Sequence, residues 1–172
     1  TAFGFDEHDD HVAVRCPWGN RLRCYEPDDA RFGATTLGIV EVELDVGPGA
    51  AEPIARFYRE VLGARATLEG SVARVQVGIA QQMVFRETDL QLMLYDGHHI
   101  QVYVADFGGV HRRLVELGLV TEESSRHQYR FVDIVDPATA AVATQLEHEV
   151  RSMTHPMYRR ALVNRNPLGC PQ

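Results

Sequence analysis

The sequence predicts an α+β fold in which two βαβββ units follow one another along the chain. Several stretches alternate polar and apolar side chains at every second position, which is typical of half-buried strands. Two other stretches repeat apolar residues at helical spacing. Strand, helix and further strands then occur twice in the same order, and this repeat is what favours paired units over one irregular domain.

The first segment, residues 1–30, is expected to contain a β-hairpin. Residues 11–27 read as two short alternating strands around the turn Trp18-Gly19-Asn20. Gly and Asn tolerate the positive φ angles of tight hairpin turns, so this position suits a reversal of the chain.

The first unit is expected over residues 36–92. Residues 37–46 alternate as a strand, with Val42, Leu44 and Val46 on its apolar face. An amphipathic helix follows, and two alternating stretches complete the unit as a strand pair. The helix is expected over 50–64 and the strands over 71–80 and 81–88.

The second unit repeats this order over residues 95–151, and residues 152–172 form a C-terminal tail. Its expected elements are a strand over 98–107, a helix over 107–118 and strands over 127–137 and 140–150. Laying the opening strands on one another with a shift of 60 residues places Ile39 on His99. The same shift places Glu87 on Glu147, so the two units are expected to share one register.

Charge and hydropathy exclude some functions. The formal charge of 17 minus 24, or −7, lacks the basic excess of a nucleic-acid-binding protein. No apolar run approaches the roughly 20 residues that span a bilayer. We therefore expect a cytoplasmic protein that binds neither nucleic acid nor membrane.

Residues that suit chemistry gather on one face of the second unit. If Ile100, Val102 and Val104 face the core, then His99, Gln101 and Tyr103 face the opposite side. In the closing strand the same reasoning places Glu147 and Glu149 on the face of His99. An imidazole beside a carboxylate suits a divalent first-row metal, and Glu87 is a further oxygen donor. The alternative is an ordinary solvated sheet face, on which such residues are common.

This arrangement resembles the vicinal oxygen chelate superfamily, which includes glyoxalase I, extradiol dioxygenases and bleomycin-resistance proteins. The tandem units, the His that opens the second one, the Glu in its closing strand and the hairpin "CPWGNRLRCYEP" carry the resemblance. It implies a cup-shaped mixed β-sheet with flanking helices and a metal inside. It covers residues 36–151 as paired modules, and the hairpin of residues 1–30 resembles the end of a further module.

The resemblance nominates His99, Glu147 and Glu87 as metal ligands. The fourth ligand position falls on Ile39, which cannot bind a metal. Glu41, His98 or a residue of the N-terminal segment is then needed, or the position stays open for substrate or water. Iron, manganese, zinc, nickel and magnesium all accept such donors.

The implied activity is that of a glyoxalase-like lyase or isomerase, or of a dioxygenase. Its small-molecule substrate would chelate the ion through two neighbouring oxygens. The candidate roles are proton transfer by Glu41 or Glu149 and substrate orientation by Tyr103 or Gln101. Arg159, in the tail, is a candidate for attracting an anionic substrate.

Two other functions remain open at this point. A metal-free small-molecule-binding protein of the resistance type is favoured by the missing ligand at Ile39. A protein interaction module would instead use the tail and the N-terminal hairpin. The edge-rich ends of the chain, together with the resemblance, are compatible with a homodimer.

Overall fold

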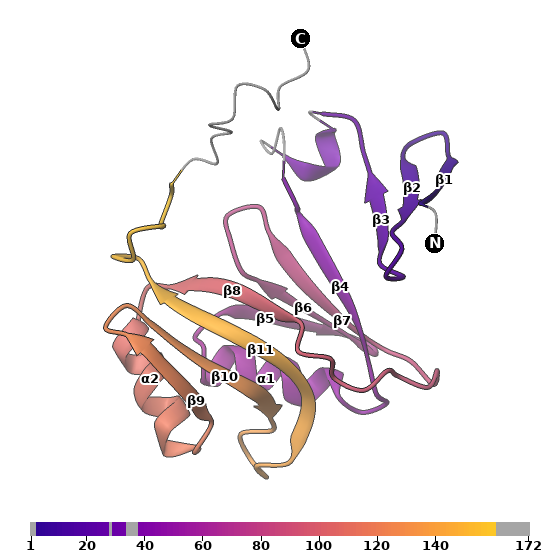
Figure 1. Cartoon of the computed structure of the whole chain (residues 1–172). Coiled ribbons are helices and arrows are strands. Elements are labelled where there is room, and N and C mark those ends of the chain that lie inside the picture. Colours follow the sequence, from indigo (N-terminus) through magenta and orange to yellow (C-terminus); the bar gives the residue numbers. More distant parts are fainter. Residues whose placement is uncertain (1–2, 28, 34–37, 161–172) are drawn as a thin grey trace.

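The structure of the protein is a computed structural model, which describes residues 3–27, 29–33 and 38–160. It confirms the α+β class and the tandem βαβββ organisation: two four-stranded mixed sheets each carry one helix, and a separate small sheet precedes them (Figure 1). The part of the expected tail beyond residue 160 lies outside the described residues.

The N-terminal segment forms three antiparallel strands, one more than the expected hairpin. They are β1 (Gly4–Glu7), β2 (Val12–Arg15) and β3 (Arg21–Cys24), in the order β1-β2-β3. The predicted turn lies between β2 and β3, and Gly19 in it has a φ of 93°. A short 3-10 helix, η1 (Ala30–Phe32), follows.

The first module contains four strands and helix α1. Its elements are β4 (Glu41–Val46), α1 (Ala51–Glu60), β5 (Arg65–Glu69), β6 (Val72–Gln76) and β7 (Gln82–Glu87). The strand order is β4-β7-β6-β5, so the opening strand pairs in parallel with the closing strand.

The second module repeats this topology. Its elements are β8 (His99–Val104), α2 (Phe107–Glu116), β9 (Val120–Ser125), β10 (Gln128–Val135) and β11 (Val142–Ser152), in the sheet order β8-β11-β10-β9. Both helices end shortly before a glycine with positive φ, Gly63 at 68° and Gly118 at 70°, which only glycine adopts without strain.

Two strands were not predicted as separate elements, β5 and β9. Both lie at the free edge of their sheets, and most of their side chains are exposed. An edge strand that buries almost nothing has no need for apolar alternation, which is the signal that identified the other strands.

The core lies on the helix side of both sheets, and α1 serves both modules. This helix packs on β5, β6 and β7 of its own sheet and on β10 and β11 of the second sheet. Its Phe57 ring lies 5.7 Å from the ring of Phe131 in β10, and both side chains are fully buried. Burying one such side chain contributes about 1.5–3 kcal/mol, so this contact holds the two modules together.

A polar pair crosses the same module interface. The Tyr58 hydroxyl of α1 lies 2.6 Å from Nε2 of His148 in β11, and both residues are fully buried. At the edge of the interface, Arg56 of α1 bonds Asp136 at 3.0 Å, and Arg113 of α2 donates to the carbonyl of Val61 at 2.8 Å.

No helix in the described part of the chain is long and apolar enough to cross a membrane. The loop between the modules nevertheless exposes apolar side chains, with Met93 95% and Leu94 92% exposed.

Candidate functional site

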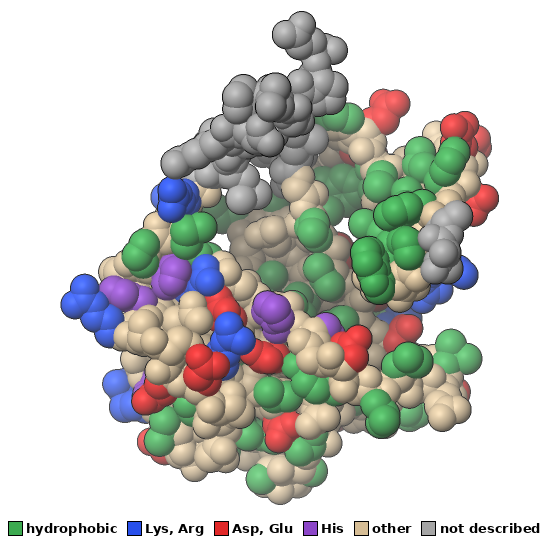
Figure 2. Space-filling model, viewed as in Figure 1, with side chains coloured by type: hydrophobic (Ala, Val, Ile, Leu, Met, Phe, Trp, Pro, Cys, Tyr) green, Lys and Arg blue, Asp and Glu red, His purple; other side chains and the backbone are tan. Residues whose placement is uncertain are grey.

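The sheet face opposite the helices, here called the open face, carries the polar residues of both modules. In the second module, β8 and β11 run parallel with His99 beside Glu147, Gln101 beside Glu149 and Tyr103 beside Arg151. Neighbouring residues in register point to the same side of a sheet, so these six side chains share the open face. Figure 2 shows His, acidic and basic side chains gathered over this part of the molecule.

His99 and Glu147 are thus brought together as the alternation predicted. His99 is exposed, and Glu147 is partly buried. Tyr95, just before β8, lies beside them: burial and the charge of Glu147 raise the pKa of its hydroxyl. The Tyr95 oxygen is buried, and within the described residues it makes no hydrogen bond of good geometry.

Glu87 lies elsewhere. It is registered with Val46, a core residue, and its carboxylate accepts a hydrogen bond of 2.8 Å from the backbone N–H of Ala51. This places Glu87 on the helix side, at the start of α1. Within the described residues, no group of three His, Cys, Asp or Glu side chains stands close enough to hold a metal. The predicted grouping of Glu87 with His99 and Glu147 is therefore not found.

The difference follows from the register of the repeat. The residues that match His99 and Ile100 are Glu41 and Val42, a shift of 58, and Ile39 precedes β4 altogether. In the closing strands, Gln82 pairs with Glu41 as Glu147 pairs with His99, a shift of 65. Loops of different length separate the elements, so no single shift fits both strands.

The first module therefore carries its own pair at the equivalent place, Glu41 and Gln82. The Gln82 amide donates to the Glu41 carboxylate at 2.6 Å, and Arg74 lies 3.6 Å from the same oxygen. The sequence comparison had matched Ile39 to His99. In the structure Glu41 matches His99 instead, and Glu41 is one of the residues considered above as the fourth ligand.

Arg130 dominates the charge around Glu147. This residue of β10 donates from Nη1 to Glu147 at 2.6 Å and from Nη2 to Glu149 at 2.7 Å. Glu149 also forms an ion pair with Arg151, and only 6% of Glu149 is exposed. Two guanidinium groups thus hold the carboxylate that was considered for proton transfer.

The remaining predicted residues lie at the other end of the same face. Arg151 approaches the Tyr103 hydroxyl at 3.4 Å, and the Tyr158 ring packs 5.1 Å from the Tyr103 ring. Arg159 lies over the Tyr158 ring at 5.5 Å. Gln101 is exposed beside Glu149. The beginning of the tail therefore covers part of the open face with aromatic side chains.

Sequence reasoning missed three residues of this region: Gln82, Tyr95 and Arg130. Arg130 alternates with the core residues Tyr129 and Phe131, so its place on the open face was readable from the strand pattern. Gln82 required the correct register. Tyr95 lies in a loop, where no periodicity indicates direction.

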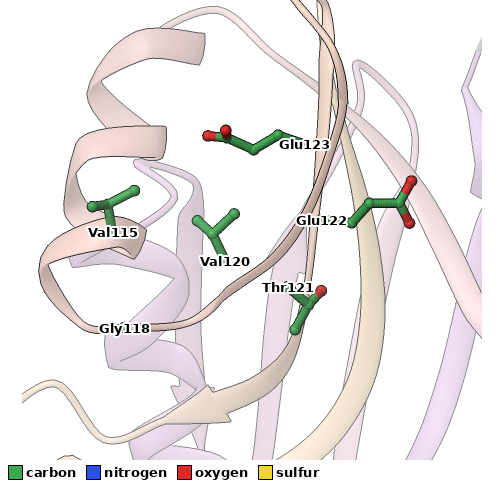
Figure 3. A pocket seen from close by; sticks show the side chains of 6 residues that line it. All are labelled: Val115, Gly118, Val120, Thr121, Glu122 and Glu123. Carbon is green, nitrogen blue, oxygen red and sulfur yellow. The ribbon is translucent and has the colours of Figure 1, made fainter.

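Surface pockets occur on the opposite side of the second sheet. One is lined by the end of α2 and by β9 (Figure 3): Val115, Gly118, Val120, Thr121, Glu122 and Glu123. Glu123 points toward α2, where it bonds His111, while Glu122 points away from the helix toward Arg130. This pocket contains none of the predicted site residues and is not the candidate site.

Among known proteins, the chain has similar solved structures but no matching family model. No curated protein matches the chain either. Similar solved structures include oxidase ChaP-H1, with 19% identity, a TM-score of 0.47 and coverage of 67% of this chain and 96% of the other. The lactoylglutathione lyase from Agrobacterium tumefaciens has 19% identity, a TM-score of 0.44 and coverage of 67% and 92%.

The fosfomycin resistance protein FosX from Mesorhizobium loti is also similar, with 18% identity, a TM-score of 0.45 and coverage of 68% and 94%. At such identities the likeness concerns the fold alone, and the function depends on the side chains of this chain.

Proposed function

We propose that this protein is a metal-dependent enzyme of the glyoxalase or dioxygenase type, acting on a small substrate that chelates the metal through neighbouring oxygens. The observation that carries the proposal is the pairing of His99 with Glu147 across the parallel strands of the open face.

The two paired side chains offer donor atoms that divalent metals accept. His99 offers an imidazole nitrogen and Glu147 a carboxylate oxygen, which suit iron, manganese, zinc or nickel and, less well, magnesium. A bound ion would stabilise negative charge that develops on a substrate oxygen. Glu87 is engaged with α1, and no third His, Cys, Asp or Glu of the described residues stands close enough to complete a site with His99 and Glu147. The proposal therefore rests on these two ligands, with substrate or water in the other coordination positions.

The other residues of the open face have supporting roles in this proposal. Arg151 and Tyr103 would orient the polar end of the substrate, and Tyr158 would cover its apolar part. Glu149 would keep Arg130 and Arg151 in place, since both guanidinium groups bond it.

The test is metal analysis of the purified protein with paired histidine variants. His98 is adjacent to His99 in sequence, is also exposed and bonds Asp96 at 2.7 Å, so His98→Ala is a matched control. We expect stoichiometric metal in the wild type and in His98→Ala, and loss of metal in His99→Ala and Glu147→Ala. Equal loss in both histidine variants would contradict the proposal.

A second candidate function is metal-free binding of a small molecule, as in a resistance protein. Arg130 occupies an oxygen of Glu147 and thereby favours it. In this case the purified protein would contain no metal, and a ligand would raise its melting temperature by mass action.

The expected homodimer stays a prediction. Sedimentation velocity tests it by measuring the mass of the protein in solution.

A further inference from the structure

The segment that follows β11, residues 153–160, lies against the open face and is here called the strap. It consists of turns and bends, without a strand or an α-helix. Two of its rings contact Tyr103 of β8: the Tyr158 ring lies 5.1 Å from the Tyr103 ring, and the His155 ring lies 6.3 Å from it. The strap is therefore held on the sheet by a small number of side-chain contacts.

Hydrogen bonding fixes the place of the proton on the His155 ring. The backbone N–H of Met157 donates to Nδ1 of His155 at 3.1 Å. An imidazole nitrogen that accepts a hydrogen bond carries no proton, so the neutral ring has its proton on Nε2. A protonated imidazole carries an N–H on both nitrogens and accepts from neither side. Protonation of His155 therefore breaks this bond and sets two N–H groups against each other inside the strap.

The groups that face His155 from neighbouring elements also disfavour its positive charge. Besides Tyr103, they are Arg151 of β11 and His127 in the turn between β9 and β10, whose ring lies 6.5 Å away. Partial loss of water lowers the pKa of His155 from its ordinary value of 6.5, and the charges of Arg151 and His127 lower it further. Glu149 acts in the opposite direction, but two guanidinium groups already pair with it.

The two ends of the strap differ in how firmly they are held. At its start, the Thr154 hydroxyl lies 2.6 Å from the Ser152 hydroxyl and 3.1 Å from Nδ1 of His127. At its far end, Arg159 has a φ of 54°, a left-handed conformation that costs free energy in a residue with a Cβ atom. The start is thus anchored to the body of the module, whereas the far end holds strain that release of the ring contacts would relieve.

We propose that the strap is an acid-released cover of the open face: neutral His155 keeps it against Tyr103, and protonation of His155 releases it. Release uncovers Tyr103 and Arg151, so that ligands enter and leave the open face more readily in acid. The strap requires no metal at His99 and Glu147, and it is therefore independent of the proposed function.

The direction of the pH dependence follows from the two states of His155. In the released strap the ring is surrounded by water and has its ordinary pKa of 6.5, whereas its pKa in the closed strap is lower. The released state binds the proton more readily, so closure is complete above pH 6.5 and is lost as the pH falls through the lower pKa. Between the two pKa values, the ratio of released to closed strap rises by at most about tenfold per pH unit.

The experiment is nuclear magnetic resonance of the full chain between about pH 5 and pH 7.5, the range in which an imidazole titrates. Long-range correlation of imidazole protons with nitrogen reports the protonation and the tautomer of His155. The nuclear Overhauser effect between the Tyr103 and Tyr158 rings reports the closed strap. We expect the proton on Nε2 at the upper end of the range, titration of His155 below pH 6.5, and loss of the ring contact with the same midpoint.

Two variants separate His155 from the other histidines. His155→Gln does not titrate and keeps an oxygen that accepts from the N–H of Met157, so its ring contact should not depend on pH. His111→Gln is the matched control, because His111 is partly buried like His155 but lies on α2, on the other side of the sheet. We expect His111→Gln to respond to pH as the wild type does.

The outcomes decide for or against the strap without reference to metal content. A ring contact that persists across the range in the wild type would overturn the proposal, as would an unchanged response in His155→Gln or a proton on Nδ1 of neutral His155. If His155→Gln fails to fold, the wild type alone decides: equal midpoints for His155 and the ring contact support release, and different midpoints overturn it. Backbone amide signals of β6 and β10 should stay constant, and their loss together with the ring contact would mean general acid unfolding and overturn the strap.

Discussion

His148 shows how one buried residue connects the two modules. It follows Glu147 in β11 but points to the opposite side, where it is fully buried and stacks on Phe131 at 4.4 Å. Its Nδ1 bonds the carbonyl of Leu146, which can only accept, so Nδ1 carries the proton. Nε2 therefore accepts the hydrogen bond from the Tyr58 hydroxyl, and the tautomer of the ring is fixed by its partners.

Removal of the Tyr58 hydroxyl should destabilise the fold. In Tyr58→Phe the Nε2 atom of His148 keeps its burial and loses its donor, which costs about 1–3 kcal/mol in the free energy of unfolding. Urea unfolding followed by circular dichroism measures the difference. Tyr103→Phe, which removes a partly buried hydroxyl on the open face, should cost less than about 0.5 kcal/mol. An equal loss of unfolding free energy in the two variants would mean that the buried hydrogen bond between Tyr58 and His148 stabilises the fold no more than an ordinary surface hydroxyl does.

The same residue predicts a dependence of stability on pH. Burial lowers the pKa of His148 to about 4, from an ordinary value of 6.5. Between these values the unfolded chain binds a proton that the folded chain does not, so stability is complete above pH 6.5 and is lost as the pH falls toward 4. The loss amounts to about 3 kcal/mol.

Unfolding of His148→Gln between pH 4 and 7 isolates this contribution, because glutamine keeps hydrogen-bonding atoms and does not titrate. We expect the wild type to lose more stability than the variant across the interval. Parallel curves for the two proteins would show that the imidazole does not titrate with a depressed pKa.

At the scale of elements, α1 begins without a capping side chain of its own. Ala50 occupies the N-cap position, and the side chain that binds the first N–H group, that of Ala51, comes instead from Glu87 in β7. A carboxylate at the N-terminus of a helix is stabilised by the unpaired N–H groups there. In α2 the equivalent role belongs to Asp106, which bonds the N–H of Gly109 at 3.0 Å.

Truncation of Glu87 should therefore reduce stability and leave metal binding intact. Glu87→Ala removes the cap and should cost about 1 kcal/mol, whereas Glu87→Gln keeps an accepting oxygen and should cost less. Thermal unfolding gives the stability, and the metal content of the folded variants gives the second readout. A folded Glu87→Ala protein that has lost its metal would return Glu87 to the ligand set.

The helices, most strands and the sharing of one face by His99 and Glu147 were predictable because apolar periodicity is a local property of the sequence. The edge strands β5 and β9 were not, since most of their side chains are exposed. The register of the repeat was not predictable either. Matching positions of the two modules differ by 58 in residue number in the first strands and by 65 in the closing strands. Matching Val42, Leu44 and Val46 to Ile100, Val102 and Val104 gives the first of these shifts. The second depends on loop lengths that no pattern marks.

At the scale of the whole molecule, α1 makes the two modules dependent on each other. Phe57 and Tyr58 contact β10 and β11, although their helix belongs to the first module. A helix shared in this way couples the unfolding of the two sheets, because neither can lose it without exposing its own core.

Phe57→Ala should weaken both modules together. A truncated buried phenylalanine costs about 3–5 kcal/mol. Native-state hydrogen exchange should show equal loss of protection in β6 and β10, with Val115→Ala on the exposed side of α2 as a mild control. Loss confined to β6 would mean that the modules unfold independently.

The parallel pairing of β8 with β11 joins the first and last strands of the second module, so that its central strand is also the last to leave the ribosome. Until residues 142–152 have been synthesised, β8 and β10 have no strand between them, and the apolar sides of both remain uncovered. Contacts between residues so distant in sequence form slowly. During translation this half of the protein is thus expected to stay open to proteases and to chance association until residues 142–152 have been synthesised.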